Sequence, residues 1–74
     1  MFKKFYEILI KHYANDKEVL AALKTYKNDV KNAKTETEIK KANRKWYNSF
    51  CLDDLAEDIS IGMMVAAVEE FENK

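Results

Sequence analysis

The sequence predicts an all-α fold, a compact bundle of three to four short helices that forms a single helical domain over residues 1–74. The chain contains one Gly and no Pro, so the residues that usually punctuate loops and β-turns are nearly absent. Apolar residues recur at intervals of three and four, which is the spacing of one helix face. Hydrophobic residues make up 47% of the chain and charged residues 35%, as in folded proteins in water.

A first amphipathic helix is expected at about residues 2–14. Its charged residues lie opposite an apolar stripe that contains Phe2, Phe5, Tyr6, Leu9, Ile10 and Tyr13. Asn15 and Asp16 follow this stripe. A short side-chain oxygen there can accept hydrogen bonds from the free N–H groups of the next helix, so the pair is expected to end one helix and cap the second.

Two further stripes predict a second and a third helix. The second stripe contains Val19, Ala22, Leu23, Tyr26, Val30 and Ala33. Thr35 and Glu38 then form a capping-box pattern, in which Thr35 caps the third helix and Glu38 reaches back toward its start. The third stripe contains Ile39, Ala42, Trp46 and Phe50.

The stretch from Ser49 to Asp54 leaves two interpretations open. The third helix either continues through it or breaks, with Ser49 or Asp53 capping a fourth helix. We favour the break, with the fourth helix near residues 53–72, because acidic residues gather there and complement the positive end of a helix macrodipole.

The fourth helix is apolar on more than one side. Its first half has one stripe, but from Ile61 onward apolar residues point in almost every direction. Such a helix must be buried all round. It is therefore either a central helix wrapped by the other three or a helix whose second face is covered by another chain. A third alternative is that Gly62 marks a kink in the helix or a close approach to another helix. The candidate apolar interface consists of Tyr47, Met64, Val68 and Phe71.

The net charge of zero combines two segments of opposite sign. The first 47 residues carry 12 Lys and Arg against six Asp and Glu, and the last 27 carry one Lys against seven acids. A candidate basic contact surface on the second and third helices consists of Lys24, Lys27, Lys31, Lys34, Lys40, Lys41, Arg44 and Lys45. It suggests DNA or RNA binding as the alternative function, although a single Arg among 13 cations favours a solvated face or a protein contact.

A candidate acidic contact surface consists of Asp53, Asp54, Glu57 and Asp58. It places like charges at i and i+4, which repel each other unless a cation or a basic partner lies nearby. We expect a basic protein surface rather than a metal ion, since the chain has no glycine-containing calcium loop and only one histidine, His12. Ser49 and Ser60 are interpreted as a cap and a polar helix-face residue. We therefore expect no enzymatic activity, no catalytic or metal-binding residue and no cofactor.

The same features predict where the protein works and what it does. The longest apolar run, residues 61–68, is far shorter than the ~20 residues that span a bilayer, so no membrane association is expected. A single cysteine fits a reducing compartment, which predicts a cytoplasmic protein. We expect a small protein-binding regulator or inhibitor that also self-associates as a homodimer. By association, its lysine- and asparagine-rich composition is common in small bacterial and phage proteins.

Overall fold

A computed structural model describes residues 1–49 and 54–73 of the chain. In this part of the chain there are four helices and no strand: α1 (Phe2–His12), α2 (Lys17–Asn32), α3 (Glu36–Ser49) and α4 (Asp54–Glu72). The predicted all-α bundle of short helices is therefore confirmed.

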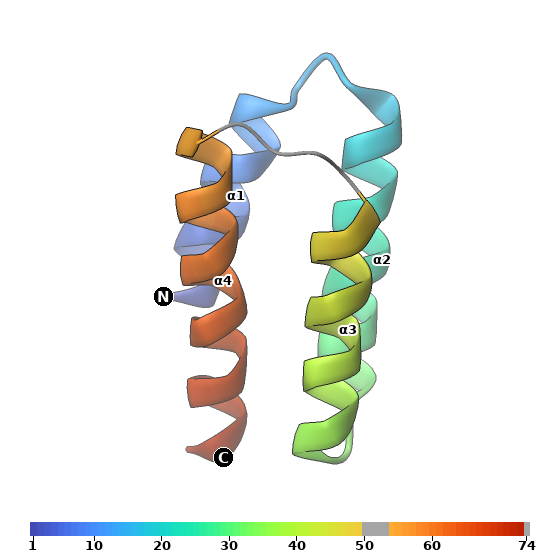
Figure 1. Ribbon diagram of the computed structural model, residues 1–74, viewed down its shortest axis with the longest axis vertical. Coiled ribbons are helices and arrows are strands. Elements are labelled where there is room, and N and C mark those ends of the chain that lie inside the picture. The colour runs from blue at the N-terminus through green and yellow to red at the C-terminus, as the bar shows by residue number, and fades with distance from the viewer. Residues whose placement is uncertain (50–53, 74) are drawn as a thin grey trace.

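The helices lie side by side along the long axis of a body with extents of 33 × 19 × 16 Å (Figure 1). Helix α4 packs mainly against α1 and also against α3, while α2 packs against α3 and, less extensively, against α1. The molecule is thus built from an α1–α4 pair and an α2–α3 pair.

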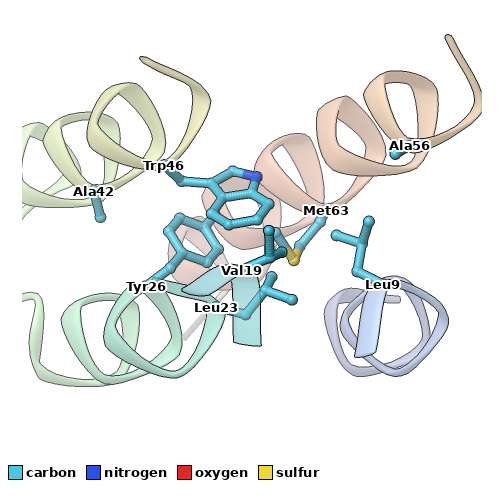
Figure 2. Close-up of a cluster of buried hydrophobic side chains, with 8 residues drawn as sticks. All are labelled: Leu9, Val19, Leu23, Tyr26, Ala42, Trp46, Ala56 and Met63. Carbon is cyan, nitrogen blue, oxygen red and sulfur yellow. The ribbon is translucent and has the colours of Figure 1, made fainter. Parts of the chain in front are cut away.

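All four helices contribute to a buried core between the two pairs (Figure 2). Its members come largely from the predicted stripes and are Leu9, Val19, Leu23, Tyr26, Ala42, Trp46, Ala56 and Met63. A second buried cluster joins α2, α3 and α4 and consists of Ala33, Ile39 and Ala67. The stripe residue Phe50 lies outside the described residues.

The caps predicted for the second and third helices form in the structure. The Asp16 carboxylate accepts a hydrogen bond from the Val19 N–H at 3.2 Å, at the start of α2. Before α3, the Thr35 hydroxyl oxygen accepts from the Glu38 N–H at 3.2 Å. The Glu38 carboxylate reaches back past Thr35 and accepts a hydrogen bond from the N–H of the preceding residue, Lys34, at 3.2 Å.

Helices α3 and α4 are separate, as the favoured interpretation requires, and Asp53 lies outside the described residues. Ser49 does not cap α4, because it is the last residue of α3 and its hydroxyl donates to the Lys45 carbonyl at 2.6 Å. Ser60, interpreted from the sequence as a polar helix-face residue, lies on the buried side of α4. Ser60 is fully buried, since α4 lies between α1 and α3, and its hydroxyl has no hydrogen-bond partner among the described residues.

Helix α4 is not a central helix wrapped by the other three. One side of it, with Ala56, Met63 and Ala66, is buried in the bundle. On the opposite side the Ile61 side chain is 43% exposed and the Val65 side chain 51% exposed. The second apolar face expected from the sequence is therefore left uncovered by the rest of the described chain.

Candidate functional site

The uncovered side of α4 carries a continuous apolar strip. Ile61, Met64, Val65 and Val68 follow the i, i+3, i+4, i+7 spacing of one helix face, and we call these four residues the α4 outer face. Ile61 and Val65 are exposed, whereas Met64 and Val68 are half-buried along the edge toward α3. Met64 and Val68 were expected in an apolar interface, but Ile61 and Val65 were missed, although the same spacing could have identified them.

A shallow groove of about 520 Å³ runs between this strip and α3. Besides the four apolar residues, it is lined by Lys40, Asn43, Glu69 and Glu72. The Asn43 amide donates a hydrogen bond to the Met64 carbonyl at 3.3 Å, and its side-chain oxygen accepts one from the Tyr26 hydroxyl. The groove is therefore held by a polar bridge that joins α2, α3 and α4.

Acidic residues stand at both ends of the α4 outer face. Glu57 and Asp58 precede the strip, and Glu69 and Glu72 follow it. From Asp54 to Glu72 the helix carries six acids and no Lys or Arg. On the α3 side of the groove, the ammonium group of Lys40 lies 3.5 Å from the Glu36 carboxylate, so its charge is partly balanced. The strip is thus an apolar surface between two negative ends.

Two predicted contact residues meet at the first of these ends. The Tyr47 hydroxyl donates a hydrogen bond to the half-buried Glu57 carboxylate at 2.8 Å, and the Tyr47 ring is 40% exposed. This hydrogen bond, together with the carboxylate charge, raises the pKa of Tyr47. Of the other acidic candidates, Asp58 is exposed, Asp54 begins α4, and Asp53 lies outside the described residues.

Phe71, the last of the apolar candidates, belongs to a different surface. It is half-buried and packs against the second buried cluster, Ala33, Ile39 and Ala67. Its ring also lines a cavity on the side of α4 that faces α1 and α2. Phe71 is therefore not part of the α4 outer face.

The eight basic candidates are all exposed, but those that line grooves lie at different seams of the bundle. Lys27 and Lys31 border the cavity between α2 and the α1–α4 pair, and the Lys27 ammonium lies 5.0 Å from the centre of the Tyr6 ring. Lys41 and Lys45 border a groove between α2 and α3 that also contains Asp29 and Glu38. Lys40 borders the α3–α4 groove. Lys24, Lys34 and Arg44 are exposed outside these grooves.

No protein-family model, curated protein or solved structure matches the chain. Within residues 1–49 and 54–73, none of the helices combines the length and the apolar character needed to cross a membrane. The same residues contain no group of three or more His, Cys, Asp and Glu side chains placed to hold a metal ion. The α4 outer face is therefore taken as the candidate functional site.

Proposed function

We propose that the protein is a small, non-enzymatic regulator or inhibitor that binds a protein partner through the α4 outer face. The observation that supports this proposal is the exposure of Ile61 and Val65 on a helix whose opposite side is fully committed to the core. Scattered exposed aliphatic residues are ordinary on protein surfaces, but an apolar strip bordered by polar residues is typical of an interaction site. The α4 outer face is such a strip.

The shape of the site favours a helical partner. An amphipathic helix can lay apolar residues at i, i+3, i+4 and i+7 into a groove between two helices. The groove between α3 and α4 is shallow, and Met64 and Val68 line it. A partner helix in this groove would bury Ile61 and Val65 against its own apolar stripe.

The charges favour a partner with Lys or Arg on either side of that stripe. Glu57 and Asp58 at one end, and Glu69 and Glu72 at the other, attract cations at both ends of a docked helix. A two-fold homodimer through α4 alone brings these acidic ends together whether the two helices run parallel or antiparallel. Self-association is therefore the second candidate, and it requires Lys40 or Arg44 of α3 to offset the repulsion.

The test is affinity capture from the native host with matched bait proteins. A bait with Ile61→Lys and Val65→Lys should lose a partner that the wild-type bait retains. The control bait carries Ile8→Lys, which alters an aliphatic residue of α1 that is 37% exposed and distant in sequence from the strip. Circular dichroism checks that all three baits are folded. Retention of the same partner by the α4 variant would show that this face is not the binding site.

Nucleic-acid binding through the lysines of α2 and α3 is the alternative function. It predicts binding to duplex or single strands that weakens steeply with added salt, because each phosphate contact releases counterions. Replacing Lys24, Lys27, Lys31 and Lys34 with Glu should then abolish binding, whereas the α4 variant should bind as the wild type does. Nucleic-acid binding that does not depend on salt, or no binding at all, would contradict this alternative and leave the protein-binding proposal.

A further inference from the structure

A cavity lies on the other side of α4, away from the α4 outer face. Helix α1 has 11 residues, against 16 in α2 and 19 in α4. Figure 1 shows the N end of the chain partway along α4, so that the last turns of α2 and α4 extend past the start of α1. The space between these last turns is the site of a cavity of about 220 Å³.

The walls of this cavity are apolar. They consist of Phe2, Val30, Ile39, Ala67 and Phe71, which come from all four helices. Ile39 and Ala67 belong to the second buried cluster and close the cavity on the side of the core. Because Ala67 carries only a methyl group, this wall leaves space that a larger side chain would fill.

The mouth of the cavity is positively charged. Lys27 and Lys31 border it, both are exposed, and neither forms an ion pair with another described residue. Glu70 is the one acid among the lining residues, and its carboxylate accepts a hydrogen bond from the Phe2 N–H at 2.7 Å and is balanced by the N-terminal ammonium group of Met1, which lies 3.8 Å away. The unbalanced charge at the mouth is therefore that of two ammonium groups.

We propose that this cavity binds a small amphiphilic anion. A short aliphatic chain or a single ring would lie against the apolar walls, and a carboxylate or similar acid group would lie at Lys27 and Lys31. The volume suits a ligand of this size, since an apolar cavity of ~150 Å³ already binds benzene and drug-sized ligands need ~300 Å³ or more. Lysine supplies a mobile point charge at the mouth, which suits a compact acid group.

Octanoate is a suitable probe, and octylammonium is its matched control with the same chain and the opposite charge. In an NMR titration below the micelle-forming concentration, octanoate should shift the methyl signals of Val30, Ile39 and Ala67 in a saturable way. Octylammonium should bind at least about tenfold more weakly, which corresponds to one ammonium–carboxylate contact of moderate strength. Equal binding of the two probes, or no saturable binding of octanoate, would overturn the proposal.

Two variants test the cavity and its mouth separately. Ala67→Leu fills the apolar space and should abolish octanoate binding in a folded protein. Val30→Phe, at a half-buried position on α2, serves the same purpose if Ala67→Leu does not fold. Lys31→Glu should reverse the preference between octanoate and octylammonium. Lys24→Glu makes the same charge change on α2 away from the cavity and should leave the preference unchanged. Unchanged binding in the filled variants, or equal effects of the two Lys→Glu variants, would place the ligand elsewhere.

Discussion

The ring of Phe5, on α1, lies against the backbone of Gly62 on α4. A Cβ atom added at Gly62 would stand 2.9 Å from Cζ and 3.0 Å from Cε1 of that ring. Real Cβ atoms essentially never come within 3.0 Å of another heavy atom, so the Phe5 ring would have to shift. Gly62 therefore leaves room on α4 for the Phe5 side chain of α1, and this contact supports the third interpretation of the fourth helix.

Gly62→Ala should destabilise the protein even though alanine is the better helix former. The substitution gains about 1 kcal/mol of helix propensity, but it forces the Phe5 ring away from its packed position. In a Phe5→Leu background the obstruction is removed, so the same substitution should stabilise the protein. Urea denaturation of the four proteins in this double-mutant cycle measures the coupling, which we expect to lie between about 0.5 and 3 kcal/mol. Equal effects of Gly62→Ala in both backgrounds would contradict the close approach.

Among the polar residues of α3, Asn43 should be the one whose substitution lowers the free energy of unfolding most. It accepts a hydrogen bond from the Tyr26 hydroxyl and donates one to the Met64 carbonyl, so Asn43→Ala leaves a buried hydroxyl without its partner. The expected loss is about 1–3 kcal/mol in the free energy of unfolding. Asn48→Ala, an exposed position on the same helix, should change that free energy by no more than about 0.5 kcal/mol.

Removing both partners of this bridge provides a second check. Tyr26→Phe removes the hydroxyl that would lose its hydrogen-bond partner in Asn43→Ala. The double variant should therefore lose less free energy of unfolding than the sum of the losses in the two single variants. Strict additivity, or a cost for Asn43→Ala no larger than for Asn48→Ala, would show that the bridge does not contribute.

The spacing of apolar residues predicted most of the core because it depends on each helix alone. Leu9, Leu23, Tyr26, Ile39 and Trp46 all come from predicted stripes and are all buried. A helical wheel fixes directions about one helix axis, and these residues define the inward direction on each helix. The same argument predicted that the fourth helix has a second apolar face.

The surface was harder to predict, because it depends on how the helices are placed relative to one another. A helical wheel shows that Lys27 and Lys41 lie away from the core. It does not show that Lys27 borders the cavity next to the α1–α4 pair, or that Lys41 borders the groove between α2 and α3. Likewise, Phe71 and Val68 both pack against the second buried cluster, and nothing local to either residue shows that Phe71 lines the cavity facing α1 and α2 while Val68 lines the groove toward α3. Such distinctions require the order of the helices around the bundle.

Thr35 should account for a measurable part of the stability of α3. Its hydroxyl oxygen satisfies the Glu38 N–H in the first turn, and the Glu38 carboxylate satisfies the Lys34 N–H in return. Thr35→Ala should lower the free energy of unfolding by about 1 kcal/mol. Thr37→Ala removes the same kind of side chain from an exposed position in the first turn and should have a smaller effect. Equal losses would mean that the cap is not formed in solution.

Tyr26 should make the protein sensitive to alkaline pH. Burial raises the pKa of its hydroxyl above the ordinary value of 10.0, so the folded state holds this proton more tightly than the unfolded state does. The resulting stability is fully present below pH 10.0 and is lost as the pH rises through the pKa of the folded state. Urea denaturation at increasing pH should therefore show a falling free energy of unfolding above pH 10.0, and Tyr26→Phe should flatten that fall. An equally steep fall in the variant would assign the alkaline sensitivity to other groups, such as Tyr6, whose pKa burial also raises.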